Sequence, residues 1–362
     1  MLSHSLTTLL ALPAILRVAL AQANTSSTPC NNSPSLCDQS YGDVTYLGAH
    51  DSPFLRDEST GFSTSGNQFF NTTVQLAAGV RLVTAQVQRA NGSSGDLHVC
   101  HTSCDLLDAG TLSSWLGEIK TWMDSNPNDV VTILLVNGAE ASADELASHY
   151  NTAGITAENS YIPTGSNYET QQWPTLSSMI NTNARIVNLI SGYTFTQTYP
   201  HLLNQFSYVF ENDYDNSSPT DFSCTASRPS AATSNGSSAA VSAGFLPLMN
   251  HFLYQDLAFG IQSPNQSYVS TTNAPSGGAG NLGQQATECS SQWGRRPSYV
   301  LVDFFNVGPA IETVDQLNGV SNPVGRRQVS EDIQMQGAAS RVGVSRVMRW
   351  ACLVGLVGMV ML

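Results

Sequence analysis

Lysine is almost absent from this chain, and charged residues in general are scarce. The 362 residues include a single lysine, Lys120, and only 11% are charged, with a formal net charge of −13. An average soluble domain has roughly 25% charged residues. Nucleic acids and anionic membrane surfaces are bound through clusters of basic side chains, and this composition supplies few of them. We therefore expect neither as the main partner.

The apolar C-terminal tail is too short to span a membrane. It runs over Trp350–Leu362, 13 residues, whereas a transmembrane helix needs roughly 20. Small residues at 337–340 and a polar spacer with three arginines precede it, the order typical of a glycosylphosphatidylinositol (GPI) attachment signal. We expect attachment at Gly337 and removal of residues 341–362 as the signal. A short membrane-dipping helix is the alternative.

The N-terminal apolar run also predicts export. Leu9–Leu20 leads into Ala19-Leu20-Ala21, a small-x-small pattern that signal peptidase cleaves. We therefore predict a signal peptide over residues 1–21, with a buried helix as the alternative, and a mature protein at the outer face of the plasma membrane or in the cell wall. Asn-x-Ser/Thr glycosylation sites favour the same compartment. They are Asn24, Asn31, Asn71, Asn91, Asn216, Asn235 and Asn265.

Six of the seven cysteines remain once Cys352 leaves with the tail. In an oxidising compartment six cysteines form three disulfides, and short separations favour two of the pairs, the third following by exclusion. The expected bridges are Cys30–Cys37, Cys100–Cys104 and Cys224–Cys289. A zinc site at Cys100, His101 and Cys104 is the alternative, but no second ligand pair with zinc spacing exists.

From residue 44 onward, β-branched apolar runs alternate with helical stretches, which is typical of a parallel α/β sheet. The expected strands cover residues 44–49, 81–88, 97–101, 130–137, 185–190, 206–211, 246–253 and 299–304, and eight strands are the number of a TIM (β/α)8 barrel. The expected helices include 112–124, 142–150, 176–181 and 309–317, with Ser142 as a cap and Pro309 in a first turn. We predict one barrel domain over 44–320, a disulfide-bearing extension over 22–43 and a flexible stalk over 321–340. Residues 216–242 and 271–283 are expected to be exposed loops.

Ionisable side chains stand where expected strands end, which is where barrels place their active groups. The first strand ends in Gly-Ala-His50-Asp51-Ser, the third ends in His101, and the last carries Asp303. A single histidine at a strand end is usually only a satisfied polar residue, but two at matching positions favour acid-base chemistry. His98 alternates away from His101 along the strand and is interpreted as structural.

The order of these motifs resembles the X domain of the phosphatidylinositol phospholipase C superfamily over roughly residues 44–320. The matching elements are Gly-Ala-His50-Asp51-Ser, Gly79-Val80-Arg81 and Leu-His-x-Cys-His101, and the last is similar to the Cys-His-x-x-Cys element of secreted eukaryotic members. The resemblance implies a somewhat distorted TIM barrel. It also implies that His50 is the general base for the inositol 2-hydroxyl and His101 the general acid for the leaving oxygen.

Two further carboxylates would assist this pair. Asp303 is expected to accept the second N–H of His50 and so fix its tautomer, and Asp51 to support the leaving-group side.

The second strand departs from the family pattern of two charged residues, because Thr84 and Gln86 occupy those positions. Both can hydrogen-bond a phosphate, and neither can neutralise it. Arg89 is a substitute cation, and Asn137 a weaker ligand. Calcium is not expected, since a hard cation prefers several carboxylate oxygens; no metal or cofactor is expected.

Three functions fit these residues. The first is a monomeric phosphodiesterase that cleaves an inositol phospholipid or glycolipid. The second is a surface-anchored barrel without catalysis that binds a lipid headgroup or glycan. The third is a barrel resembling glycerophosphodiesterases or sphingomyelinase D. Those proteins hold a divalent metal with acidic residues on the early strands, and Thr84 and Gln86 of this chain do not provide such ligands.

Overall fold

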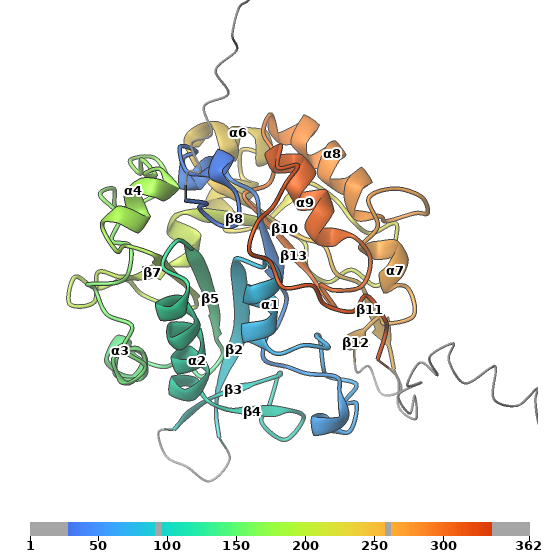
Figure 1. Cartoon of the computed structure of the whole chain (residues 1–362), viewed down its shortest axis with the longest axis horizontal. Helices are drawn as coiled ribbons and strands as arrows, with labels where there is room; N and C mark the ends of the chain where they lie inside the picture. Colours follow the sequence, from blue (N-terminus) through green and yellow to red (C-terminus); the bar gives the residue numbers. More distant parts are fainter. Residues whose placement is uncertain (1–27, 91–95, 258–261, 335–362) are drawn as a thin grey trace, which may run out of the picture.

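The computed structural model describes residues 28–90, 96–257 and 262–334 (Figure 1). Its strands are β1 (Tyr46–Ala49), β2 (Leu82–Arg89), β3 (Leu97–Cys100), β4 (Asp108–Thr111), β5 (Val131–Asn137), β6 (Ile186–Ser191), β7 (Leu202–Asn204), β8 (Val209–Asn212), β9 (Ala226–Arg228), β10 (Leu246–Asn250), β11 (Tyr254–Asp256), β12 (Gln262–Pro264) and β13 (Tyr299–Val302). Its helices are α1 (Thr72–Ala78), α2 (Leu112–Ser125), α3 (Ala143–Thr152), α4 (Leu176–Asn181), α5 (Ser230–Thr233), α6 (Ser237–Ala243), α7 (Val269–Thr272), α8 (Leu282–Trp293) and α9 (Ala310–Asn318).

Parallel strands in the order β7-β6-β5-β2-β1-β13-β10-β8 form the curved central sheet. Within the described part of the chain no pairing joins β7 to β8, so the sheet stays open there, and β8 instead pairs with β9 in antiparallel fashion. All residues of β1, β6 and β13 are buried, as in sheets covered on both faces. The predicted α/β fold is confirmed as a distorted, open barrel.

One strand assignment from the sequence was wrong. Leu97–Cys100 is not a barrel strand but the antiparallel partner of β2 and β4. The physical reason is that β2, with eight residues, extends past the barrel and pairs there with β3 (Figure 1). Leu97 and Val99 are buried while His98 between them is half-buried, a one-sided alternation typical of an antiparallel edge. The short strand β7, which was not predicted from the sequence, is a barrel strand instead and pairs with β6 in parallel fashion.

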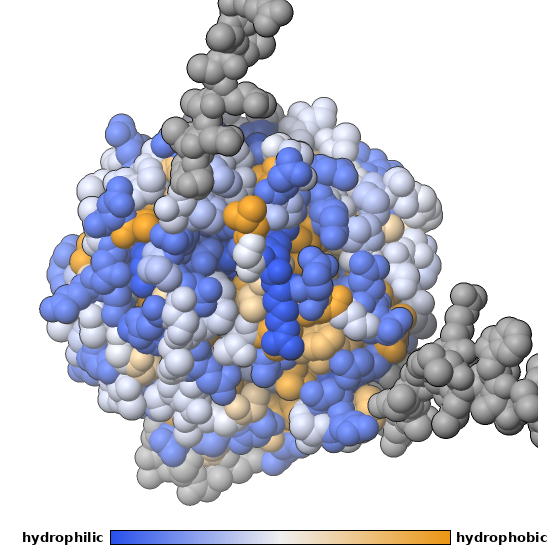
Figure 2. Space-filling view, viewed as in Figure 1, coloured by the Kyte–Doolittle hydropathy of each residue, from blue (hydrophilic) through white to orange (hydrophobic). Residues whose placement is uncertain are grey.

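Helix α3 begins directly after Ser142, as expected, and α9 begins directly after Pro309, which was expected inside its first turn. Ser142 caps α3 and forms a capping box with Glu145, and α4 covers the expected residues. Helix α2 buries Trp115, Leu116 and Ile119 at helical spacing. In Figure 1, α1 and α2 lie in front of β2 and β5. Figure 2 shows this face covered mostly by hydrophilic side chains, with the hydrophobic areas divided into separate small patches.

The chain after α9 is packed against the barrel, where a flexible stalk was expected. Val324 exchanges two hydrogen bonds with Asn32, and the Arg327 N–H donates to the Ala77 carbonyl oxygen. Arg326 forms a bidentate ion pair with Asp315 of α9. Residues 321–334 therefore form a strap along α9 and α1 (Figure 1). Residues 335–340 lie outside the described residues.

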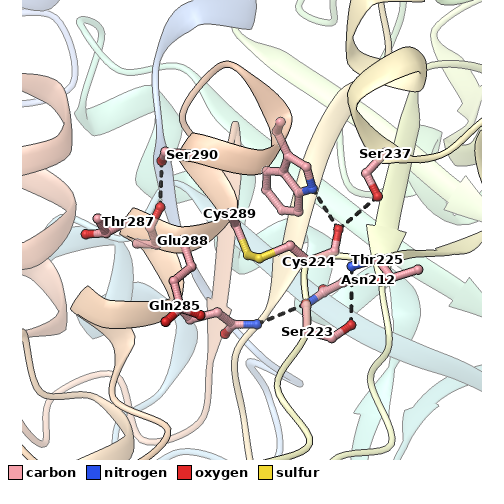
Figure 3. The surroundings of a disulfide bond; sticks show 12 residues. Asn212, Ser223, Cys224, Thr225, Ser237, Gln285, Thr287, Glu288, Cys289 and Ser290 are labelled. Carbon is pink, nitrogen blue, oxygen red and sulfur yellow. Dashed lines mark hydrogen bonds between the residues drawn. A yellow bond between two sulfur atoms is a disulfide. The ribbon is translucent and has the colours of Figure 1, made fainter.

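All three predicted disulfides are present: Cys30–Cys37, Cys100–Cys104 and Cys224–Cys289. The third joins α8 to the segment after β8, which was expected to be an exposed loop and is instead folded (Figure 3). The Cys224 carbonyl oxygen accepts from Ser237 and Trp293, and the Ser223 carbonyl oxygen accepts from Asn212. Because Ala232 and Ala240 are also buried, this segment contributes to the core.

The predicted glycosylation sites differ in exposure. Asn31 and Asn216 are 4% and 1% exposed, and the Asn31 side-chain oxygen accepts from the Val130 N–H. Burial of both side chains disfavours a glycan at these two positions, and glycosylation at each of the seven sites stays a prediction. Asn71 and Asn235 are exposed and Asn265 is half-buried.

Several other predictions concern residues outside those that the structure describes. They are the signal peptide over 1–21, Asn24, Asn91, Gly337, Cys352 and the attachment signal over 341–362. In the described ranges, no helix is long and apolar enough to cross a membrane.

Candidate active site

A cavity of about 250 Å³ opens at the carboxyl ends of the barrel strands. Its walls hold both apolar and ionisable side chains. The lining residues are His50, Asp51, Thr84, Gln86, Leu134, Val136, Gln205, Glu211, Tyr214, Arg228, Leu248, Asn250, Phe252, Tyr254 and Leu301. Four predicted site residues thus line one cavity, because β1 and β2 are neighbours in the sheet.

His50 follows β1 and is held from two sides. Its Nδ1 lies 2.9 Å from Asp303 Oδ1, directly after β13, and the Phe252 ring stacks on the imidazole with 3.8 Å between centroids. A carboxylate acceptor at Nδ1 fixes the tautomer that leaves Nε2 as the free basic nitrogen. Burial lowers the pKa of His50, but the charges of Asp51 and Asp303 outweigh it, so the pKa is raised above 6.5.

His101 follows β3, outside the barrel proper. The Cys100–Cys104 disulfide closes the turn that carries it, and the Phe54 ring packs edge-on against the imidazole. Burial lowers the pKa of His101 below 6.5, and the nearby Asp51 carboxylate offsets this only in part. Both cysteine sulfurs are bonded to each other, which rules out the zinc site considered at Cys100, His101 and Cys104.

Asp51 lies between the two histidines. Its Oδ2 is 3.7 Å from Nε2 of His50 and 3.7 Å from Nε2 of His101. Asp51 adopts a left-handed backbone conformation with φ of 48°, in which its N–H donates to Thr84 Oγ1 at 2.8 Å. The separations exceed hydrogen-bond length, so the carboxylate acts on both imidazoles through its charge.

The two neutral residues of β2 are already engaged. Gln86 donates from Nε2 to Asp51 Oδ2 at 2.8 Å, and its Oε1 accepts the Thr102 N–H at 2.9 Å. Gln86 thereby connects Asp51 to the turn that follows His101, while Thr84 holds the Asp51 backbone. In this geometry Thr84 and Gln86 position Asp51, whereas the sequence suggested that they contact substrate.

Two other predicted binding residues do not reach the cavity. Arg89 pairs with Glu145 of α3 at 2.9 Å. Asn137 donates to the carbonyl oxygens of Ala141 and Gly192 and accepts the Ala141 N–H, so its amide stabilises the turn after β5. The structure brings neither of them to His50 or His101.

An ion pair in the cavity, between a buried carboxylate and a partly exposed guanidinium, was missed from the sequence. Arg228 of β9 pairs with Glu211 of β8, and the guanidinium lies over the Tyr214 ring at 4.6 Å from its centroid. Burial raises the pKa of Glu211 even though Arg228 opposes this. Glu211 ends an apolar strand, the same signal that identified Asp303. Arg228 stands in a stretch rich in Ser, Ala and Thr, where no pattern points to it.

Clusters of side chains that could together bind a metal are few in the described part of the chain. The one cluster with suitable spacing is His98, Cys100 and Asp108, and Cys100 is committed to its disulfide. The remaining two residues, which hydrogen-bond each other on the β3–β4 hairpin, offer too few ligands for zinc.

Comparison with known proteins shows the family of this chain. The PI-PLC X family model matches residues 36–318. A PI-PLC X domain-containing protein 1 of Arthroderma benhamiae is 33% identical over 291 residues, covering 80% of this chain and 90% of the relative. An uncharacterized secreted protein of the same fungus is 32% identical over 305 residues, a match that covers 83% of this chain and 65% of that protein.

Among solved structures, a mutant of the phosphatidylinositol-specific phospholipase C of Staphylococcus aureus superposes with a TM-score of 0.50. The two share 14% identity over 77% of this chain and 94% of that one, which is a likeness of fold. The extent of the family match and the identity to the fungal relatives lead to one conclusion: the chain belongs to the PI-PLC X family.

Proposed function

We propose that this protein is a phosphodiesterase that cleaves a phosphatidylinositol-type lipid or glycolipid through His50 and His101. The observation that carries the proposal is the position of both Nε2 atoms, each 3.7 Å from the same oxygen of Asp51, a residue that lines the cavity together with His50. Two imidazoles that flank one carboxylate can remove one proton and supply another on opposite sides of a phosphorus atom.

In the proposed reaction, His50 Nε2 takes the proton of the inositol 2-hydroxyl, and that oxygen attacks the adjacent phosphorus. The bond from phosphorus to the glycerol oxygen breaks, and His101 donates a proton to the departing oxygen. The products are a cyclic inositol phosphate and diacylglycerol. Asp303 accepts from His50 Nδ1 throughout and stabilises the imidazolium that forms.

The Glu211–Arg228 pair is a suitable contact for the headgroup. Among the described residues lining the cavity, Arg228 is the only arginine or lysine, and its hydrogen bond to Glu211 comes from Nε, so neither Nη atom donates to another described residue. A carboxylate and a guanidinium side by side can accept from and donate to ring hydroxyls. The Tyr214 and Tyr254 side chains provide apolar wall around the same space.

The phosphate lacks a dedicated cation in this proposal. Thr84 and Gln86 are uncharged and hydrogen-bonded to the Asp51 turn. A preorganised donor aimed at developing charge is commonly worth about 3 to 4 kcal/mol. We therefore expect turnover on the order of 100- to 1000-fold below that of a site with such a cation.

The test is an assay of the purified mature protein on phosphatidylinositol vesicles, with calcium or with a chelator, that detects cyclic inositol phosphate. We expect product with the wild type in both conditions, and its loss in His50→Ala and in His101→Ala. His98→Ala is the matched control, because His98 lies on the same hairpin and pairs with Asp108 away from the cavity. Equal rates in all four proteins would refute the mechanism.

A barrel that binds headgroups without cleaving them is the second candidate. The observation that favours it is that β2 directs no charge-neutralising group into the cavity, because Gln86 is neutral and bound to Asp51 and Arg89 pairs with Glu145. It predicts saturable binding of inositol phosphate by calorimetry in the absence of any product.

We further propose that the protein is an exported, GPI-anchored monomer with N-linked glycans. Support comes from the two terminal signals, from the disulfides and from the Arthroderma benhamiae relative that is named a secreted protein. Release of the native protein from the cell surface by a bacterial phosphatidylinositol-specific phospholipase C, together with its size on gel filtration, tests anchor and oligomeric state.

A further inference from the structure

Asn67 contacts both members of the His50–Asp303 pair. Its Nδ2 lies 2.9 Å from Asp303 Oδ1 and 3.2 Å from His50 Nδ1, and the residue is fully buried. Since His50 Nδ1 and Asn67 Nδ2 both approach the same carboxylate oxygen, both are donors to it. The 3.2 Å contact is therefore an approach of two donors.

The orientation of the Asn67 amide leaves one buried polar atom unsatisfied. Its Oδ1 has no hydrogen-bond partner among the described residues. Turning the amide by 180° would direct this oxygen at the Asp303 carboxylate, which is repulsive, and would remove a donor from a buried anion. A buried polar atom without a partner is costly. The Asn67 amide is nevertheless oriented with its Nδ2 donating to Asp303.

The backbone around Asn67 fixes the amide in place. The Asn67 N–H donates to the Phe54 carbonyl oxygen, and its own carbonyl oxygen accepts the Phe304 N–H, both at 2.8 Å. The Gln68 side chain donates to the His50 carbonyl oxygen at 2.8 Å. At Gly66 a Cβ atom would lie 2.3 Å from the Leu55 carbonyl oxygen, so only glycine permits this close approach.

We propose that Asn67 is a positioning residue, which holds the Asp303 carboxylate in place and limits how strongly it draws the proton of His50. The amide hydrogens stabilise the Asp303 anion and lie close to the imidazole, and both effects disfavour imidazolium. The base of the proposed reaction must be neutral when substrate binds. Asn67 thus acts against the raised affinity of His50 for a proton.

Several charged groups set the same equilibrium and stay unchanged in the test. They are Asp51 on the turn after β1, Asp303 after β13, Glu211 on β8, His101 after β3 and, through Asp303, the buried Arg56. Because the carboxylates raise the proton affinity of His50, loss of the Asn67 donor should raise it further.

The experiment is a proton NMR titration of His50, assigned by its loss in His50→Ala, in the full mature protein. Asn67→Leu replaces the amide with an apolar side chain of similar shape, and Asn67→Ala is the second variant should packing fail. We expect the pKa of His50 to rise by about 0.5 to 1 in either variant. Asn188→Leu is the control, since this fully buried amide of β6 donates to Ser160 and His201 instead, away from the cavity.

An unchanged or lowered pKa of His50 in the Asn67 variants would overturn the proposal. A kinetic readout accompanies the titration and depends on the proposed function. The pKa of His50 is the higher of the two histidine pKa values, so it sets the alkaline limb of the pH profile of kcat/KM. This limb should move to higher pH in the Asn67 variants. The plateau of kcat/KM should fall about three- to tenfold, because molecules with neutral His50 and protonated His101 become rarer. If the wild type shows no turnover, the proposed function fails while the titration still decides the role of Asn67.

Discussion

Gln86 donates a hydrogen bond of 2.8 Å to Asp51, and this contact helps to join the two segments that carry His50 and His101. The other end of the same amide accepts from Thr102, the residue after His101. The position of Asp51 therefore depends on a neutral side chain of β2. A glutamate at this position would instead oppose Asp51 and raise the proton affinity of both histidines.

The first prediction concerns this contact. Gln86→Ala removes one donor from Asp51 and one acceptor from Thr102, so the Asp51 turn and the His101 turn lose their common support. We expect kcat on phosphatidylinositol to fall about 10- to 100-fold with a smaller change in KM, corresponding to about 1 to 3 kcal/mol for an unsatisfied buried group. Gln88→Ala on the same strand is the control, and equal kcat values in both variants would contradict the assigned role.

The second prediction concerns pH. The pKa of His101 is lowered and that of His50 raised relative to 6.5, so kcat/KM should follow a bell with an acidic limb below 6.5 and an alkaline limb above it. In Asp303→Asn the raising charge beside His50 is lost. The alkaline limb should then move to lower pH by about 1, together with a loss of activity on the order of 100-fold or more. An alkaline limb that stays in place would show that another group titrates there.

The third prediction concerns the disulfide that holds the segment after β8. Cys224 and Cys289 are 65 residues apart in the chain, and their bridge fixes the segment that carries Arg228 (Figure 3). Replacing both cysteines with serine should lower the free energy of unfolding by about 2 to 4 kcal/mol in urea titrations. Because Arg228 then loses its fixed position over Tyr214, binding of inositol phosphate should weaken as well. Unchanged affinity would separate Arg228 from headgroup recognition.

The fourth prediction concerns the strap. Arg326→Ala leaves the Asp315 carboxylate, which is 8% exposed, without its bidentate partner. Removing one member of a buried pair costs about 3 to 5 kcal/mol, which a urea titration resolves. Arg327→Ala, at the exposed neighbouring position, should change the free energy of unfolding by less than about 0.5 kcal/mol. Similar small effects in both variants would indicate that the strap is not bound as described.

The sequence predicted the parts of the fold that local patterns control. Apolar runs identified most barrel strands, Ser142 marked a helix start, and cysteine spacing led to the correct disulfides. The proximity of His50 and Asp303 followed from a buried carboxylate at a strand end, which requires a partner.

Contacts between distant segments could not be predicted in this way. Arg228 reaches Glu211 only because β9 adds to β8 in antiparallel fashion, and the sequence of that segment has no strand periodicity. The short strand β7 has too few residues for a pattern. The strap is polar and carries several charges, so composition alone suggested a stalk, while its packing depends on carbonyl oxygens and on Asp315 elsewhere in the fold.

The central claim is that His50 and His101 act together in phosphodiester cleavage. Phosphorus NMR of phosphatidylinositol mixed with the purified mature protein tests this most directly, because a five-membered cyclic phosphate has its own resonance. We expect this signal with the wild type and with His98→Ala, and its loss with His50→Ala and with His101→Ala. A cyclic phosphate signal of equal intensity in the two latter variants, or no signal with the wild type at any pH across its stable range, would contradict it.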